Sequence, residues 1–482
     1  MSPYVIPSDM VIAGQFGHLA HHNNLSDAVS AAAGYNVTNA AYAGGADPTG
    51  TSDSTAAINA AISAAGSAGG GVVVLPPGTY KTTGTVSIGA DNVILRGHGW
   101  HSVIQPAAGS NFDAISTPLP PAAGSSGYIR NYIGVENLMV DQSNMNGNGT
   151  TAGQGNGIHF YGVRYSVIDR VYVLRSPNWA VLIDGDNTAP GFNFSYDNLV
   201  SRCVFDICNA NIYMTGSEAC DFTQNRFKWC GTATNAAQPA NGSQDTNAMH
   251  LRLGGGMAYV AGNIFGKGGT YTTECIRCSN SAPYRIIGNR FDGVRNSCIK
   301  MNAGNVMFAF NQLSSPCQAG TSNYGVQIGS NNNAVIGNTV DTVAGAIVYA
   351  YAIGESGGPF TGNRISGNFL LAGTSGTILQ NASSANQIDD NAGYNPVGKI
   401  GSPPAVPASA SAATNTTGAD CFVFVTCGAG VSVSAISVGG QAYPNPGTVS
   451  AATTSTAIRV PAGQTITLTY AGGTPTWTWF GD

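Results

Sequence analysis

The chain has 482 residues, a formal net charge of -5 and only 9% charged residues, against roughly 25% in an average soluble domain. Hydrophobic residues make up 43% of the chain, which is enough to bury a large core and does not match a disordered protein. The small negative charge excludes an extended basic surface for nucleic acid. No apolar run reaches the roughly 18 residues of a membrane span, so we expect no membrane insertion.

Residues 1–42 form the first predicted segment. Its start, MSPYVIPSDMVIAGQFGH, lacks a basic region followed by an apolar stretch and a cleavage site, so we expect no signal peptide. Four residues fit one face of a short helix: Leu19, Leu25, Ala28 and Val29. Three histidines nearby have a spacing that can bind a metal, but a packed or solvated helix face is the simpler interpretation: His18, His21 and His22. We predict no metal and no cofactor.

The next stretch, 43–104, carries a specific motif. It reads GADPTG, then DSTAAI, then GGGVVVLPPGTY and finally GHGWHSVI. Asp53 or Ser54 can cap a helix whose Ile58 and Ile62 face the same way. The stretch resembles the opening of the pectate lyase superfamily β-helix, in which such a helix covers the first coil. The resemblance implies the fold and leaves the chemistry open, because this fold serves lyases, hydrolases and non-catalytic proteins.

Residues 43–395 contain an internal repeat built on asparagine. The pattern of apolar residues around Asn recurs at six positions: 225, 263, 289, 311, 338 and 363. From position 263 onward the intervals are 26, 22, 27 and 25 residues. A period of this length with short β-rich segments is typical of a solenoid, in which stacked coils bury one continuous core. We predict an all-β right-handed parallel β-helix in which the amide of each repeat Asn bonds to the next coil.

The repeat also predicts which side chains face inward. Twelve or thirteen residues before each Asn lies an apolar residue, and these should share one interior column: Ile212, Leu251, Ile276, Ile299 and Val326. Because side chains alternate along a strand, the next residues should form an outward column. That column is Tyr213, Arg252, Arg277, Lys300 and Gln327. The same alternation predicts that the preceding residues point outward too: Asn211, His250, Cys275, Cys298 and Gly325, with His159 outward on the same sheet.

A Pro/Ala/Ser-rich linker (396–413) precedes a small antiparallel β-domain (414–482). The domain is predicted from the alternation of apolar and polar residues in segments such as CFVFV, VSVSAISV and TITLTY. Cys421 and Cys427 flank FVFVT, where a hairpin disulfide is one alternative and two free thiols the other. The lone C-x-x-C of Cys275 and Cys278 is predicted to be a pair of buried thiols.

The two ends of the chain add a second resemblance. GQFGHLAHHNNLSDAV (14–29) is similar to the N-termini of tail proteins from phages of actinobacteria, and the whole arrangement resembles a phage tailspike. The resemblance implies a virion protein, a homotrimer, and an N-terminal segment that docks on other tail proteins. In such a trimer Trp477, Trp479 and Phe480 are expected to contribute aromatic burial between subunits.

The outward column suggests a site for binding an anionic glycan. Three cations on successive rungs repel one another unless an anionic glycan or nearby carboxylates neutralise them, and both alternatives are open. Our candidate catalytic residues are Glu274, Asp245, Arg277 and Lys300, and the candidate substrate-binding residues are Arg252, His250, Tyr213, His159 and Gln327. Further carboxylates predicted near the column are Asp184, Asp186, Glu218 and Asp292, while Asp206 and Lys228 read as a structural pair. If the column binds substrate, Arg277→Ala should weaken binding and leave stability nearly unchanged.

We therefore predict a phage tailspike that binds, and depolymerises, an acidic cell-surface polysaccharide of the host. The alternative is a receptor-binding tail fibre without catalysis. A secreted pectinase is disfavoured by the missing signal peptide. The sequence identifies neither the polysaccharide nor the choice between elimination and hydrolysis.

Overall fold

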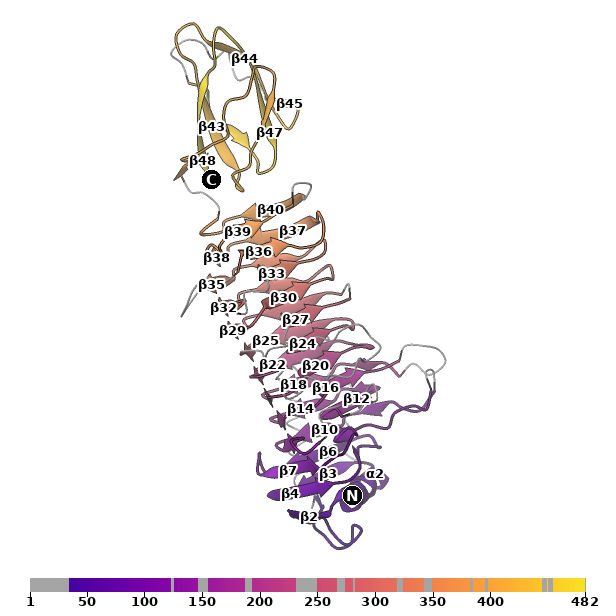
Figure 1. The fold of residues 1–482 in the computed structure, drawn as a ribbon. Coiled ribbons are helices and arrows are strands. Elements are labelled where there is room, and N and C mark those ends of the chain that lie inside the picture. The colour runs from indigo at the N-terminus through magenta and orange to yellow at the C-terminus, as the bar shows by residue number, and fades with distance from the viewer. Residues whose placement is uncertain are drawn as a thin grey trace.

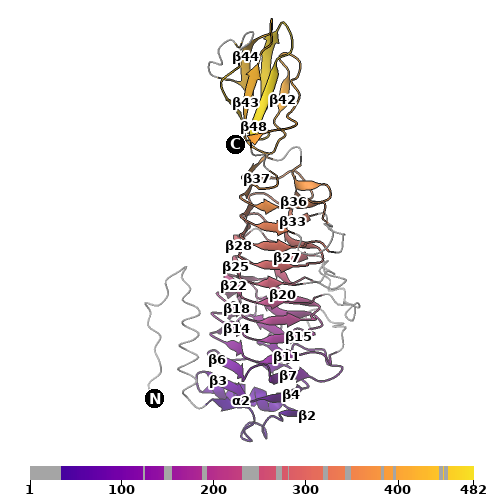
Figure 2. The same ribbon diagram turned by 90° about the vertical axis from the view of Figure 1, so that its left-hand side faces the viewer.

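The structure is a computed structural model that describes residues 34–481 except 123–124, 146–154, 187–192, 231–248, 267–273, 281, 319–323, 342–348, 382–384, 395–397, 444–448 and 450–453. Three long parallel sheets wind into a solenoid, and a small antiparallel domain lies beyond its last coil (Figures 1 and 2). The predicted right-handed parallel β-helix is confirmed. The predicted N-terminal helix, with His18, His21 and His22, lies outside the described residues.

Sheet A has thirteen strands. They are β1 (Tyr35–Asn36), β3 (Gly71–Leu75), β6 (Val93–Gly97), β10 (Gly134–Glu136), β14 (Val167–Asp169), β18 (Leu199–Ser201), β22 (Cys220–Thr223), β25 (Ala258–Ala261), β28 (Tyr284–Ile287), β31 (Met307–Ala309), β34 (Ala334–Ile336), β37 (Thr361–Ser366) and β40 (Ala385–Asp389). Because β1 pairs with β3, the first coil begins a few residues before the predicted start at residue 43.

Sheet B has twelve strands. They are β2 (Thr49–Asp53), β4 (Gly78–Thr82), β7 (Ser102–Pro106), β11 (Met139–Asp141), β15 (Tyr172–Leu174), β19 (Val204–Asp206), β23 (Arg226–Phe227), β26 (Ile264–Phe265), β29 (Arg290–Asp292), β32 (Gln312–Ser314), β35 (Thr339–Asp341) and β38 (Phe369–Leu370).

Sheet C has eleven strands, and a short sheet D of four strands follows it in several coils. Sheet C contains β5 (Val86–Ser87), β8 (Ile115–Ser116), β12 (Ile158–Tyr161), β16 (Trp179–Asp184), β20 (Ala210–Met214), β24 (Leu251–Leu253), β27 (Glu274–Cys278), β30 (Ser297–Met301), β33 (Tyr324–Ile328), β36 (Tyr351–Glu355) and β39 (Gly376–Leu379). Sheet D contains β9 (Arg130–Asn131), β13 (Val163–Arg164), β17 (Ser195–Tyr196) and β21 (Ser217–Glu218).

Helix α2 (Thr55–Ser67) covers the open end of the first coil, as predicted. Its apolar face, including Ile58 and Ile62, is buried against the solenoid. The N-cap residue is Ser54, whose side chain makes no capping hydrogen bond. Instead the carboxylate of Asp53 accepts hydrogen bonds from the backbone N–H and the hydroxyl of Thr55, the first helical residue. The helix thus shields strand edges and apolar side chains that would otherwise meet solvent.

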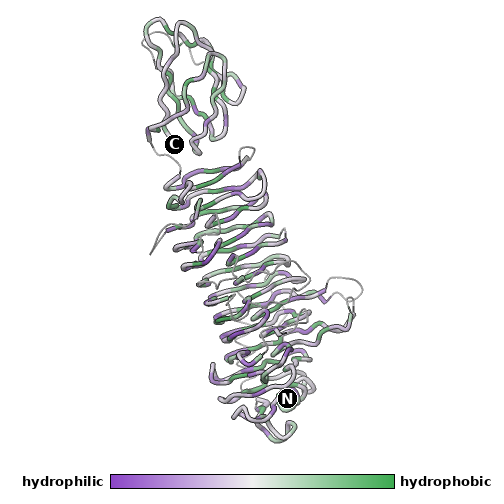
Figure 3. The backbone as a smooth tube through the Cα atoms, in the orientation of Figure 1, coloured by the Kyte–Doolittle hydropathy of each residue, from purple (hydrophilic) through white to green (hydrophobic). Residues whose placement is uncertain are grey.

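Hydrophobic and hydrophilic stretches alternate along the coils (Figure 3), and the apolar side chains fill one continuous interior. Five phenylalanines stack through successive coils at ring-centroid distances of 5.2, 4.6, 4.8 and 5.8 Å: Phe205, Phe227, Phe265, Phe291 and Phe308. Each buried ring contacts the rings above and below, so an individual coil depends on its neighbours for its core.

The predicted asparagine ladder is present between sheets A and B. After the first member, Oδ1 of each Asn accepts hydrogen bonds from the backbone N–H and the Nδ2 of the Asn one coil earlier. The series is Asn225, Asn263, Asn289, Asn311, Asn338, Asn368 and Asn391. The assignment of Asn363 to this ladder is wrong, because Asn363 lies inside β37 and accepts from Asn333 in a second ladder. The motif SGNFL, five residues later, supplies the next rung.

The C-terminal domain has two four-stranded antiparallel sheets. One contains β41 (Gly398–Lys399), β48 (Thr476–Gly481), β43 (Cys421–Thr426) and β46 (Ile458–Val460), and the other contains β42 (Ala412–Thr414), β47 (Thr465–Ala471), β44 (Ser432–Val438) and β45 (Gln441–Ala442). The predicted linker therefore contributes β41 and the start of β42 to this domain.

The structure decides two points for this domain: the open choice between a disulfide and two free thiols, and the expected role of Trp479 between subunits. Cys421 and Cys427 stand at the two ends of a single extended segment, about 20 Å apart at a rise of about 3.3 Å per residue, so no hairpin disulfide links them. Trp479 is fully buried within its own domain, and Nε1 of Trp477 donates to the carbonyl of Pro404 over 2.8 Å. Trp479 is thus a core residue that offers no surface to another subunit.

No helix in the described part of the chain is long and apolar enough to cross a membrane.

Candidate functional site

The predicted interior column is confirmed on sheet C. Ile212, Leu251, Ile276, Ile299 and Val326 pair in register through β20, β24, β27, β30 and β33. All five side chains have no exposed surface. The repeat therefore located the correct strands and the correct face of each strand.

The outward column follows from the same register. Tyr213, Arg252, Arg277, Lys300 and Gln327 are direct neighbours across the ladder. Four of the five are half-buried, whereas Arg277 is only 8% exposed. Its guanidinium Nε pairs with Oε1 of Glu274, which is 5% exposed, so the central cation of the column is neutralised by a carboxylate on its own strand.

Aromatic rings continue the column towards the N-terminus. The ring of Trp179 lies 5.1 Å from that of Tyr213, centroid to centroid, at an interplanar angle of 38°. The guanidinium carbon of Arg252 lies 4.5 Å from the centroid of the Tyr213 ring. Trp179 was not singled out in the sequence; counting one more coil back, to Val181, would have found its strand. The three side chains combine a flat apolar surface with a cation.

The predicted outward position of His250 is wrong. Its side chain is fully buried against Phe227 and Phe265, with ring centroids 5.9 and 6.0 Å away. The Nδ1 atom lies 2.7 Å from Nδ2 of Asn211, and Nε2 lies 3.1 Å from the carbonyl of Gly266. Burial lowers the pKa of His250 to about 4, only partly offset by the Gly266 carbonyl, so the ring is neutral at pH 7. Asn211, Cys275 and Cys298 are buried as well.

For His250 the reason is its position in the coil, whereas Asn211, Cys275 and Cys298 lie within their strands and are buried there. Strand β24 begins at Leu251, one residue after His250, so the chain is still turning from sheet B when it passes His250. Strand alternation does not apply before the strand begins. The ring consequently points towards the phenylalanine stack inside the solenoid.

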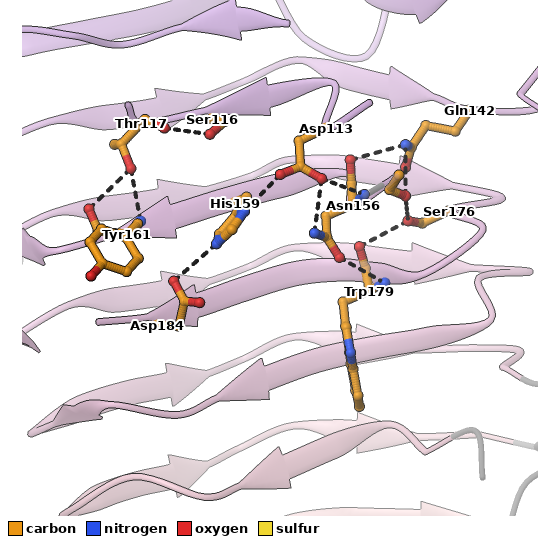
Figure 4. A network of polar contacts seen from close by, with 11 residues as sticks. Asp113, Ser116, Thr117, Gln142, Asn156, His159, Tyr161, Ser176, Trp179 and Asp184 are labelled. Atoms are coloured by element: carbon orange, nitrogen blue, oxygen red, sulfur yellow. Dashed lines mark hydrogen bonds and ion pairs between the residues drawn. The ribbon is translucent and has the colours of Figure 1, made fainter. Parts of the chain in front are cut away.

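His159 lies on the outer side of sheet C, in register with Ser116 and Leu182, but it is only 5% exposed. Figure 4 shows its ring between two carboxylates: Nδ1 is 2.7 Å from Oδ2 of Asp113 and Nε2 is 2.9 Å from Oδ1 of Asp184. Although burial opposes protonation, hydrogen bonds and charge from the two aspartates outweigh it and raise the pKa of His159 to about 10. His159 is therefore an imidazolium ion that bridges two carboxylates.

The network extends on both sides of His159. Oδ1 of Asp113 accepts from the backbone N–H and Nδ2 of Asn156, and Oδ1 of Asn156 accepts from the backbone N–H of Trp179 at 3.2 Å (Figure 4). The Asp184 side chain keeps 24% of its surface exposed. The bridge thus orients one exposed carboxylate and anchors the strand that carries Trp179.

The other candidate carboxylates are spread over the molecule. Asp245 lies outside the described residues. Glu218 is exposed on β21 of sheet D, and Asp292 is exposed on sheet B, where it pairs with Arg290 over 3.3 Å. Asp292 is therefore wrongly assigned to the sheet C face. The structural pair of Asp206 and Lys228 is confirmed at 3.2 Å.

Among the residues described, no group of three or more His, Cys, Asp or Glu side chains could hold a metal ion. The cysteines of β27 are buried thiols, as predicted.

Comparison with known proteins identifies the fold. Residues 38–238 match the family model described as rhamnogalacturonase A/epimerase, pectate lyase-like. No curated protein sequence matches the chain. The tailspike protein of E. coli bacteriophage HK620, solved as a mutant in complex with a pentasaccharide, is similar in structure with a TM-score of 0.53 and 13% identity over 95% of this chain and 94% of that one. A DFA-IIIase from Arthrobacter chlorophenolicus A6 without its lid has a TM-score of 0.51 and 18% identity over 74% of this chain and 94% of that one. The solenoid is therefore a right-handed parallel β-helix, and its first part, residues 38–238, is similar to the pectate lyase-like family.

Proposed function

We propose that the protein is a phage tailspike that binds an acidic cell-surface polysaccharide along the outer face of sheet C and depolymerises it. The observation that carries the proposal is the in-register outward column from Tyr213 through Arg252 to Lys300. The Trp179 ring, although out of register with it, packs against Tyr213, and Arg252 lies over the Tyr213 ring. The likeness to a tailspike over nearly the whole chain supports the phage role. A homotrimer docked to other tail proteins through its N-terminus belongs to the same proposal.

The binding chemistry follows from the side chains. A sugar ring stacks on the face of Tyr213 or Trp179, and Arg252 holds a sugar carboxylate through a planar fork of N–H donors. Further along the bound glycan, Lys300 adds a positive point charge, and the amide of Gln327 hydrogen-bonds to sugar hydroxyls. Successive rungs lie about 4.8 Å apart, so one extended glycan contacts several coils.

Our candidate catalytic residues for cleavage are Glu274, Asp245, Arg277 and Lys300. Elimination needs a base and a cation that neutralises the uronate carboxylate, whereas hydrolysis needs two carboxylates on either side of the bond. Asp184, whose side chain is 24% exposed, adds a carboxylate on the same sheet. One observation favours the non-catalytic alternative: Glu274 and Arg277 are buried and already paired with each other.

The test is incubation with host envelope polysaccharide, with reducing ends and absorbance at 235 nm measured together. New reducing ends together with a rise in absorbance at 235 nm indicate elimination, and new reducing ends without that rise indicate hydrolysis. Binding without either product leaves a receptor-binding fibre. Arg252→Ala and Lys300→Ala should each weaken binding by about tenfold at low salt and less at high salt. The matched control is Arg290→Ala on sheet B, which should bind normally; equal loss in the control would reject the sheet C site.

A further inference from the structure

A second aromatic surface lies on a different face of the solenoid. Trp100, in the turn between β6 and β7, is 46% exposed. Its ring lies 5.1 Å from that of Tyr172 on β15, at an interplanar angle of 56°. Nε1 of Trp100 donates to the carbonyl of Arg170 over 3.2 Å. The indole therefore reaches from the turn before β7 to the coil of β15, and a hydrogen bond fixes its orientation.

Polar groups border the rings. The hydroxyl of Tyr172 donates to Oδ2 of Asp206 over 2.9 Å, and Nζ of Lys228 lies 3.2 Å from the same oxygen. The ammonium also lies 5.8 Å from the centroid of the Tyr172 ring. Burial and the hydrogen bond to Asp206 raise the pKa of Tyr172 to about 12, so its hydroxyl stays protonated. The ion pair makes this cluster neutral while keeping both donors and acceptors beside the rings.

The oriented indole offers a ligand a fixed apolar surface, and burying that surface is worth about 25 cal/mol per Å². A protein partner needs about 800 Å² on each side. Two aromatic side chains supply at most roughly 300–500 Å². The surroundings are polar, with Gln105 hydrogen-bonded to Asp141 and Arg226 exposed. The apolar area suits a small ring, and the polar border suits hydroxyl groups.

We propose that Trp100, Tyr172, Asp206 and Lys228 form a second carbohydrate-binding site, which takes a neutral β-linked pyranose. A pyranose with equatorial substituents presents an apolar face of axial C–H groups that fits Trp100. Its hydroxyls donate to Asp206 and accept from Lys228. This site is separate from the sheet C column and does not depend on the function proposed for that column.

The probes are cellohexaose and hexa-N-acetylchitohexaose, two neutral β-linked hexasaccharides. They are titrated by calorimetry into the protein at about 0.5 M salt, which screens surface electrostatics. Wild-type protein should bind at least one of them saturably. Trp100→Ala should weaken that binding at least tenfold, and Tyr172→Phe should weaken it several-fold because Asp206 loses its donor. Phe369→Ala is the matched control, since Phe369 is 66% exposed on the same sheet many coils away; it should bind normally.

Absence of saturable binding of both probes to the wild-type protein would overturn the site. So would binding that survives Trp100→Ala, because the sugar would then lie elsewhere. Light scattering separates the remaining alternative: a lower assembly mass for Trp100→Ala means that a second copy covers the indole, which also rejects the site. Arg252→Ala should leave hexasaccharide binding intact, so failure of the sheet C proposal and failure of this site are distinguishable.

Discussion

Arg277 pairs with Glu274, three residues earlier on β27, and both side chains are buried. The sequence left open whether a glycan or local carboxylates neutralise the outward cations. At this rung a local carboxylate does so. This reverses the expectation that Arg277→Ala leaves stability nearly unchanged, because a buried ion pair contributes to stability only while both partners are present.

Arg277→Ala should lower the free energy of unfolding by about 3–5 kcal/mol, because Glu274 would remain buried without its partner. Urea denaturation measures the loss. Arg290→Ala removes one partner of an exposed pair and should cost less than about 0.5 kcal/mol. Equal stability of the two variants would contradict the buried pair. The double variant Glu274→Leu with Arg277→Met should recover much of the loss.

His159 should make the protein less stable at alkaline pH. Its pKa is raised to about 10 in the folded chain, against about 6.5 when unfolded. Its contribution is complete below pH 6.5 and declines as the pH rises towards 10, because over this interval the folded chain holds a proton that the unfolded chain has released. Denaturation at pH 6.5, 8 and 9 should show this decline in the wild type and a flatter profile in His159→Gln. The exposed His98, replaced in the same way, is the control.

His250 should have the opposite effect at acid pH. Its folded pKa is lowered to about 4, so as the pH falls from 6.5 the unfolded chain takes up a proton that the folded chain does not. The wild type should lose stability relative to His250→Phe by up to about 1.4 kcal/mol per pH unit across this interval. Parallel denaturation curves of the two proteins between pH 6.5 and 4.5 measure the difference. A constant difference would mean that His250 is accessible to protons.

Asn311→Ala should interrupt the asparagine ladder. Oδ1 of Asn311 accepts from the backbone N–H and Nδ2 of Asn289 at 2.9 and 3.0 Å, and the residue is 2% exposed. Removing the acceptor leaves two buried donors unpaired, at a cost of about 2–5 kcal/mol in thermal or urea unfolding. Asn302→Ala, at an exposed position, should cost less than about 0.5 kcal/mol. A small effect at Asn311 would mean that water replaces the missing amide.

Periodicity predicted the fold because the solenoid uses the same inward positions in every coil. Ile276 and Ile299 could be assigned from spacing alone, and strand alternation then gave Arg277 and Lys300 correctly. The same rule failed for His250, since no spacing marks where the turn ends and the strand begins.

Contacts between side chains on different coils were out of reach of the sequence. Asp113 and Asp184 meet at His159 although they are 71 positions apart, and neither stands in a motif. The exposed cluster at Trp100 depends on Tyr172, two coils further along the stack. Such contacts depend on the length and direction of individual side chains that reach from one rung to another. The repeat length carries no information on these side chains.

The in-register outward column makes the binding face modular. Each coil adds one side chain to the column, while the interior column and the asparagine ladder repeat unchanged beneath it. Duplication or deletion of a single coil therefore lengthens or shortens the face by about 4.8 Å without altering the rungs on either side. The length of the proposed glycan-binding face can in this way change through coil number, in addition to point substitutions.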